Sequence, residues 1–235
     1  MSIIPDKVDV VIPVKTKESI RNEFIERIRE EIPVNKLIII EGGALSTARK
    51  RAYEKVSTEW FVFLDDDVMI GKGWWKTMTS HIDNETGAIG GIIYPVHPHL
   101  GRFMEVIWML RDSGKLGTPG IDNCLMRKEC LKDYDPPEIF YGEDEILYKH
   151  VTKKWKWKRI RVNGLHYTTI KDMIQRGYTC NKLQLYPKRN VIRRFLLIPL
   201  LSFFVGLKSH SLTTAFWIAN YYLDFLVGWM KALVN

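Results

Sequence analysis

Short apolar runs alternate with amphipathic segments through the first 64 residues of the chain. The runs at residues 8–14, 37–40 and 60–64 are rich in Val, Ile, Leu and aromatic residues, which is typical of strands buried on both faces. Apolar residues recur at helical spacing in residues 18–32 and 47–56, so each segment predicts a helix with one face against a sheet. This β-α-β-α-β order predicts parallel strands with right-handed crossovers.

The second half of the chain is less regular but contains further strand patterns. Residues 88–95 and 121–127 predict strands, and the alternation in residues 155–162 predicts an edge strand. Residues 136–151 predict a loop that leads into a helix. Ser46 is predicted to be the N-cap of the helix that follows it. We therefore expect an α/β fold.

Three aspartates, Asp65, Asp66 and Asp67, directly follow the apolar run that ends at Leu64. Like charges at the end of a buried strand repel each other and resist burial, unless a cation or a hydroxyl-rich group binds there. Ligands of open α/β sheets collect at the carboxyl ends of strands, where Pro13 and Glu41 are also expected. The pattern predicts a metal-bound phosphate site; the alternative is a solvated turn.

Composition and charge narrow the possible partners. The chain has 235 residues, three cysteines without a CxxC pair and a net charge of +8. Residues 149–194 contain 14 lysines or arginines and one acid. Such a block suits nucleic acid, anionic lipid headgroups or a phosphorylated substrate. Nucleic acid is the least favoured of these, because the block leads into apolar segments rather than aromatic RNA-binding motifs.

Two apolar segments follow the basic block. As helices, residues 193–207 would span about 20 Å and residues 212–234 about 34 Å, of which only the second could cross a bilayer core. Four polar residues of the second segment share one helical face: Thr213, Asn220, Asp224 and Lys231. This pattern predicts a helix that lies on a membrane or packs against a partner subunit, because a lone membrane span does not easily tolerate Asp224.

Five pieces of the sequence are informative as an ordered set. They are VDVVIPVKT, IIIEGG, LSTARKRAYEKVSTEWFVFLDDDV, IDNCLMRKEC and GEDEIL, which together cover roughly residues 7 to 170. As an ordered set they resemble the family 2 glycosyltransferases of the GT-A fold. One departure is the segment between Glu41 and the helix with Ala48 and Arg49, which is shorter than usual for that family.

The resemblance implies a Rossmann-like mixed sheet flanked by helices. It also implies the transfer of a sugar from a nucleotide donor, usually with inversion and with a divalent cation, Mn²⁺ or Mg²⁺. Asp65 and Asp67 would form the D-x-D motif, with Asp67 on the metal, Asp65 on the ribose or the metal, and Asp66 among the donor-binding residues. His166 would complete the metal shell, and Asp144 would be the catalytic base.

Further residues are expected to contact the donor. Arg49 lies in the first turns of a helix, where the helix dipole disfavours an arginine unless an anion is near, and it would face the base or the diphosphate. Simpler interpretations remain: Asp144 suits a helix N-terminus electrostatically, and His166 could be a structural histidine. The residues that would face the nucleoside are Pro13, Val14, Lys15 and Glu41.

The leading hypothesis is a membrane-associated, metal-dependent, inverting glycosyltransferase on the cytoplasmic face of the cell membrane. Its acceptor would be lipid-linked, such as a polyprenyl phosphate or its saccharide, or else a saccharide. Residues 1–190 would form the catalytic domain, and residues 191–235 would associate with the membrane or form a homo-oligomer. One alternative is a sugar-nucleotide nucleotidyltransferase, although VIPVKTKES stands where a glycine-rich basic loop would follow the first strand. Another is a non-catalytic membrane-surface binding protein with a transferase fold.

Overall fold

The computed structural model describes residues 4–103, 121–139, 142–167, 173–183 and 188–234. The chain divides into two compact units. The first contains Met1–Ile93 and Leu116–Tyr167, and the second contains Tyr94–Lys115 and Thr168–Asn235. The second unit therefore includes a segment from the middle of the sequence. The boundary of a separate catalytic domain at residue 190 stays a prediction.

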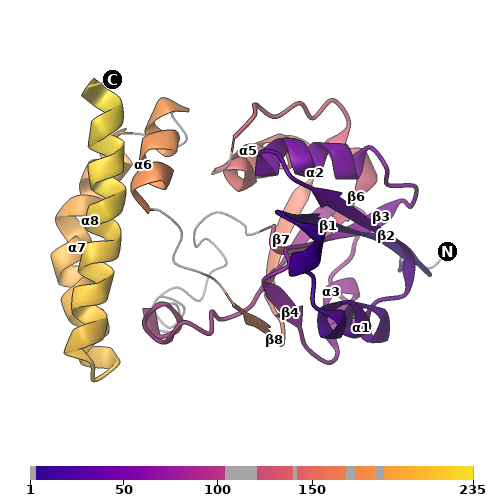
Figure 1. Cartoon of the computed structure of the whole chain (residues 1–235), viewed down its shortest axis with the longest axis horizontal. Helices are drawn as coiled ribbons and strands as arrows, with labels where there is room; N and C mark the ends of the chain where they lie inside the picture. Colours follow the sequence, from indigo (N-terminus) through magenta and orange to yellow (C-terminus); the bar gives the residue numbers. More distant parts are fainter. Residues whose placement is uncertain (1–3, 104–120, 140–141, 168–172, 184–187, 235) are drawn as a thin grey trace. The chain divides into compact units, whose positions relative to one another are not determined.

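A six-stranded mixed sheet lies at the centre of the first unit (Figure 1). β1, β2 and β3 are parallel, β6 is antiparallel to both β3 and β5, and β5 is parallel to β7. The mixed α/β architecture and the edge position of the strand within residues 155–162 are thus confirmed. The spatial order is β2 (Val34–Glu41), β1 (Val8–Val14), β3 (Trp60–Leu64), β6 (Asn123–Arg127), β5 (Thr86–Ile92) and β7 (Lys156–Arg161).

Helices cover both faces of this sheet (Figure 1). α2 (Leu45–Tyr53) and α5 (Glu143–Val151) pack on one face, and α1 (Asn22–Glu31) and α3 (Trp74–Thr79) pack on the other. Alternate residues of β3 enter opposite cores, so every side chain of this strand is buried. Burial on both faces explains why residues 60–64 are uniformly apolar. Two short 3₁₀ helices, η1 (Lys17–Ser19) and η2 (Lys128–Leu131), complete the connections.

Ser46 has a different role from the one its sequence position predicts. The N-cap of α2 is Ala44, so the prediction that Ser46 caps this helix is wrong. Ser46 lies in the first turn, where its Oγ donates to the Pro137 carbonyl (2.8 Å) and accepts from the Ile139 N–H (2.8 Å). The hydroxyl therefore fastens the loop before α5 to α2, because that loop has backbone groups to satisfy at a buried position.

A second, two-stranded sheet lies beside the acid cluster. β4 (Val68–Ile70) begins directly after Asp67 and pairs in antiparallel register with β8 (Gly164–His166). The pairing aligns Val68 with His166. It thus brings a residue from the end of the first unit's sequence to the turn that contains the three aspartates.

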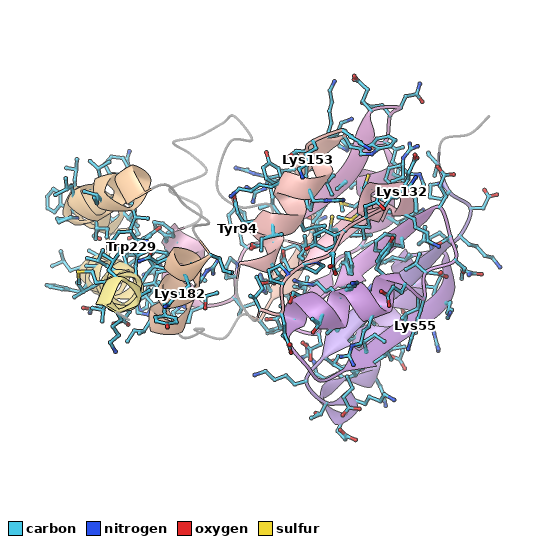
Figure 2. All side chains as sticks on the ribbon, turned by 90° about the horizontal axis from the view of Figure 1, so that it is seen from above. Lys55, Tyr94, Lys132, Lys153, Lys182 and Trp229 are labelled. Carbon is cyan, nitrogen blue, oxygen red and sulfur yellow. The ribbon has the colours of Figure 1, made fainter. Side chains whose placement is uncertain are left out.

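The second unit contains α6 (Met173–Lys182), α7 (Lys188–Lys208) and α8 (Leu212–Val234). α6 and α8 pack with their backbones close together: a Cβ on Gly177 would lie 1.9 Å from the Phe225 carbonyl oxygen. Asn181 Nδ2 donates to the carbonyl of Trp229 (2.6 Å), a residue labelled in Figure 2. In the described part of the chain, no helix combines the length and apolar character needed to cross a membrane.

The exposed surface of α8 carries the predicted polar residues together with large apolar ones, such as Leu212 and Phe216. The four polar residues that were expected to share a face are all exposed, whereas Ile218, Leu226 and Trp229 on other sides of the helix are buried. The exposed polar residues are Thr213, Asn220, Asp224 and Lys231.

Candidate active site

The three aspartates form a turn that backbone hydrogen bonds fix at the end of β3. The Asp65 N–H donates to the Asp122 carbonyl (2.8 Å), and the Val68 N–H donates to the Asp65 carbonyl (3.1 Å). The side chains of Asp65, Asp66 and Asp67 are all partly exposed, although the strand before them is fully buried. The structure therefore presents the carboxylates at the carboxyl end of a central strand, where solvent and a ligand can reach them.

The two-stranded sheet places His166 beside Asp67. The Tyr167 N–H donates to the Asp67 carbonyl (2.8 Å), which extends the β4–β8 pairing past the turn. The His166 Nε2 atom then lies 3.6 Å from Asp67 Oδ2. The family resemblance predicts Asp67 and His166 in one site, and the structure brings these two side chains together. Their binding of a metal stays a prediction.

Asp122 is a residue of this site that the sequence analysis missed. Its Oδ2 atom lies 3.6 Å from His166 Nδ1, so the imidazole ring stands between two carboxylates. Burial acts to lower the pKa of His166, but Asp67 and Asp122 outweigh burial and raise it. Burial in turn raises the pKa of the Asp122 carboxyl, and His166 opposes that rise. The antiparallel pairing of Leu64 with Asn123 and the hydrogen bond from the Asp65 N–H to the Asp122 carbonyl place Asp122 here.

Arg49 connects two acidic parts of the site. Its Nη2 donates to Asp65 Oδ1 and its Nη1 donates to Glu143 Oε1, both at 2.6 Å. The guanidinium is buried; burial acts against its charge, but the Asp65 and Glu143 carboxylates raise its pKa. The anion expected near the start of this helix is thus supplied by the protein itself. Both Nη atoms already bind carboxylates. Contact of Arg49 with the donor stays a prediction.

Glu143 and Asp144 lie next to each other at the N-terminus of α5 but face different surroundings. Gly142 precedes them with φ of 84°, a left-handed conformation that glycine adopts without strain. Glu143 is buried against Arg49; burial raises the pKa of its carboxyl and the guanidinium opposes the rise. Asp144 is half-buried, and its Oδ1 accepts from the Glu145 N–H (2.9 Å). Glu143 therefore anchors the helix end, and Asp144 keeps access to solvent.

The other predicted donor contacts lie at the same edge of the sheet. β1 and β2 end together, with Val14 aligned with Glu41, and the register that aligns Val11 with Phe63 carries Pro13 level with Asp65. Pro13 lies within β1, beyond its last aligned pair with β3, where a residue without an N–H is tolerated. The side chains of Pro13 and Val14 are buried, whereas Lys15 and Glu41 are exposed. Only the latter two offer side chains to a nucleoside.

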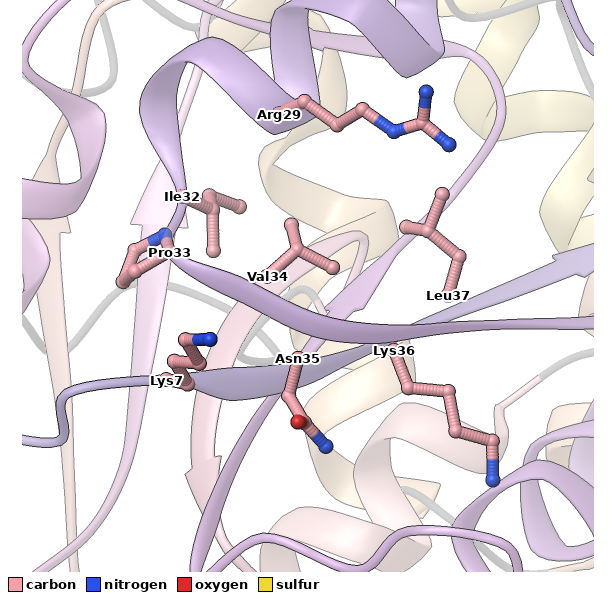
Figure 3. Close-up of a pocket in the computed structure, with 8 residues that line it drawn as sticks. All are labelled: Lys7, Arg29, Ile32, Pro33, Val34, Asn35, Lys36 and Leu37. Carbon is pink, nitrogen blue, oxygen red and sulfur yellow. The ribbon is translucent and has the colours of Figure 1, made fainter.

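A surface hollow of about 460 Å³ lies elsewhere on the first unit (Figure 3). It is lined by residues at the starts of β1 and β2, with Lys7, Arg29 and Lys36 at its sides. β1 and β2 start at this hollow and run parallel to β3, which ends at the three aspartates. The hollow therefore lies at the opposite end of the strands from the aspartates. Among the residues that the structure describes, no group of three or more His, Cys, Asp or Glu side chains could hold a metal ion by itself.

Residues 18–133 match the family model of glycosyl transferase family 2. Together with the mixed α/β sheet described above, this match indicates a glycosyltransferase. The matched stretch contains Arg49, Asp65 to Asp67 and Asp122, whereas Asp144 and His166 lie beyond it. No curated protein sequence matches the chain.

Solved structures share the fold at low sequence identity. Glucosyl-3-phosphoglycerate synthase from Mycobacterium tuberculosis, in complex with Mg²⁺ and UDP, superposes with a TM-score of 0.53 and 13% identity, covering 70% of this chain and 72% of that one. The same enzyme with Mn²⁺, UDP-glucose and phosphoglyceric acid gives 0.50 and 14%, covering 70% and 73%. A mycobacterial protein gives 0.58 and 13%, covering 76% and 72%. These likenesses confirm the GT-A fold.

Proposed function

We propose that this glycosyltransferase transfers a sugar, with inversion, from a nucleotide-diphosphate donor held by Asp65, Asp67 and His166 with Mn²⁺ or Mg²⁺. The observation that carries the proposal is the meeting of Asp67 with His166 at the end of a central strand. Carboxylate oxygens and an imidazole are suitable ligands for Mn²⁺, and Mg²⁺ is bound by one or two carboxylates together with substrate phosphates. Such a cation neutralises the charge that grows on the leaving diphosphate.

Asp144 is the proposed general base. An inverting transfer needs a group that takes the proton of the acceptor hydroxyl on the face opposite the leaving group. Asp144 keeps solvent access at the start of α5, while the neighbouring Glu143 is engaged by Arg49, which also binds Asp65. One arginine thereby fixes the helix end that carries the base relative to the turn that would hold the donor.

The test separates donor binding from transfer. The melting temperature of the protein is measured with a panel of nucleotide sugars and Mn²⁺, and we expect stabilisation by one nucleotide class that needs the metal. The M. tuberculosis complexes with UDP make uridine donors the first to try. Asp144→Asn should keep this stabilisation and lose about 10²- to 10⁴-fold in kcat. If no nucleotide sugar stabilises the protein, the proposed function is wrong.

We further propose that the second unit attaches the enzyme to the cytoplasmic face of the membrane, where the acceptor is lipid-linked. The support is an apolar face on α7, on which Leu196, Leu200, Phe203 and Leu207 recur at helical spacing and are 70%, 67%, 59% and 57% exposed. Four large apolar side chains in one exposed row are unusual for a soluble helix and are typical of one that lies in a lipid interface.

The charges around α7 favour an anionic lipid surface as the occupant of this face. α7 begins with the sequence KRNVIRR, at the end of the basic block, and ends at the exposed Lys208. Each Lys or Arg near an anionic leaflet contributes about 1 kcal/mol to binding. A protein partner or a second copy of the chain could also cover the apolar residues of α7. Neither would gain a comparable advantage from the positive charges around them.

Vesicle sedimentation tests this second proposal. The protein should sediment with vesicles that contain phosphatidylglycerol, and Leu196→Gln combined with Leu200→Gln should weaken binding by at least about 10-fold. Val96→Gln replaces a similarly exposed apolar residue outside α7 and should change nothing. Failure to sediment, or a dimer that the double variant dissociates, would contradict membrane attachment. Transfer to phosphoglycerate that is indifferent to vesicles would contradict the lipid-linked acceptor.

A further inference from the structure

We propose that Asp122 is a positioning residue of the donor site: when a cation is bound, its carboxylate accepts the Nδ1–H of the nearby His166 ring, which directs His166 Nε2 towards Asp67 and the cation. The inference rests on the proposed function, because it concerns the metal site of the donor. Asp122 lies in the piece IDNCLMRKEC, to which the sequence analysis assigned no role at this position.

The geometry is that of a ring held between two carboxylates. His166 Nε2 faces Asp67 Oδ2 and His166 Nδ1 faces Asp122 Oδ2, each at 3.6 Å. The side chains of His166 and Asp122 are 19% and 21% exposed, so the contact is shielded but within reach of a ligand. The two nitrogens of the ring point to opposite sides, so a carboxylate on one side and a cation on the other can be served by the same ring.

Asp122 is itself held firmly. Its carbonyl accepts from the Asp65 N–H, and its Oδ2 accepts from Asn123 Nδ2 at 3.3 Å. Asn123 is fully buried, accepts from Trp74 Nε1 and donates to the Gly91 carbonyl. A Cβ on residue 91 would lie 1.7 Å from Asn123 Oδ1, so a glycine there is required for this arrangement. Several neighbouring groups thus fix the position of the Asp122 carboxylate.

In this proposal Asp67 and Asp122 have different roles. A metal-binding imidazole usually donates its other N–H to a carboxylate or carbonyl, which fixes the tautomer and the ring orientation. With Asp122 as the acceptor at Nδ1, the neutral ring would present the lone pair of Nε2 on the side of Asp67. Asp67 and His166 would then contact the cation, and Asp122 would act only through His166.

Manganese binding followed by electron paramagnetic resonance tests this assignment without measuring turnover. Asp122→Ala should weaken Mn²⁺ binding by about 10- to 100-fold and remove the coupling of bound Mn²⁺ to a histidine nitrogen. Asp122→Asn keeps an oxygen that accepts from Nδ1–H, so it should retain the nitrogen coupling and lose less affinity. Asp135→Asn removes an acid that is 81% exposed and should match the unmodified protein.

The outcomes distinguish this inference from the proposed function. If the unmodified protein binds Mn²⁺ and His166→Gln weakens binding while Asp122→Ala does not, the role of Asp122 is refuted and the donor site stands. If Asp122→Ala weakens binding but leaves the nitrogen coupling unchanged, Asp122 does not act through His166 and the inference is wrong. If the unmodified protein does not bind Mn²⁺ even with the nucleotide, the metal-dependent function falls as well.

Discussion

Arg49 fixes the geometry of the candidate site through two ion pairs. Its two Nη atoms bind carboxylates from two different elements, the turn after β3 and the start of α5. Burial gives these ion pairs a low-dielectric setting, so each charge depends on its partners. The planar guanidinium can reach both carboxylates at once, which a lysine ammonium on its flexible stem does less well.

Replacing Arg49 should lower the stability of the first unit. Arg49→Met leaves Asp65 and Glu143 without their shared counter-charge, and we expect a loss of about 3–5 kcal/mol in the free energy of unfolding, measured with urea. Arg27→Ala is the control, because its ion pair with Glu30 is exposed and should contribute less than about 1 kcal/mol. Equal stability of Arg49→Met and the unmodified protein would mean that the pair of bridges does not hold the site together.

At the scale of elements, the strands and the parallel pairing of β1, β2 and β3 were predictable, but the antiparallel position of β6 was not. Uniform apolar runs predicted β1 and β3, because a strand that is buried on both faces has few positions for polar residues. The antiparallel entry of β6 beside β3 depends on long-range pairing, and Asp122 is brought to the site by that pairing alone. Asp67 and His166 were assigned to one site by resemblance, whereas the β4–β8 pairing supplies the physical reason.

Asp9 is a buried link between three elements of the first unit. It lies in β1 and accepts hydrogen bonds from Ser57 N–H and Oγ–H before β3 and from Asn35 Nδ2 in β2. Burial acts to raise the pKa of Asp9, but these hydrogen bonds outweigh it and lower the pKa. Its contribution to stability is therefore present above the pKa of an unfolded aspartate, about 3.9, and is lost as pH falls through the lower pKa of the folded state.

Asp9→Asn should make this dependence visible. An asparagine cannot accept all of these hydrogen bonds, so we expect a loss of about 2 kcal/mol at neutral pH and a flatter decline of stability below about pH 4. Urea titrations across the pH range measure both effects. Asp135→Asn, at an exposed acid, should keep the profile of the unmodified protein. An unchanged acid profile in Asp9→Asn would show that other carboxylates cause the decline.

At the scale of the whole molecule, the second unit draws on two separate parts of the sequence. His99 Nδ1 lies 3.0 Å from Thr214 Oγ1, and the rings of His97 and Trp217 lie 4.8 Å apart. Phe103 joins a small core with Val205 and Ile218. Composition could not predict this, because the segment before residue 104 carries no pattern that points to α8.

Truncation after residue 190 tests this arrangement. The shortened chain lacks Thr214, Trp217 and Ile218, so we expect faster hydrogen exchange at residues 97–103, while β1 and β3 keep their protection. Hydrogen exchange followed by mass spectrometry compares the two chains. Retained protection at residues 97–103 would instead support a self-sufficient domain that ends near residue 190, as the sequence analysis predicts.

The pairing of β4 with β8 has a consequence for folding during synthesis of the chain. Asp67 leaves the ribosome long before His166, and the loop between them must close before the two strands can pair. A nascent chain therefore carries the acid turn for most of its synthesis without its imidazole partner. If both residues bind a cation, as proposed, that binding could begin only when the first unit is almost entirely synthesised.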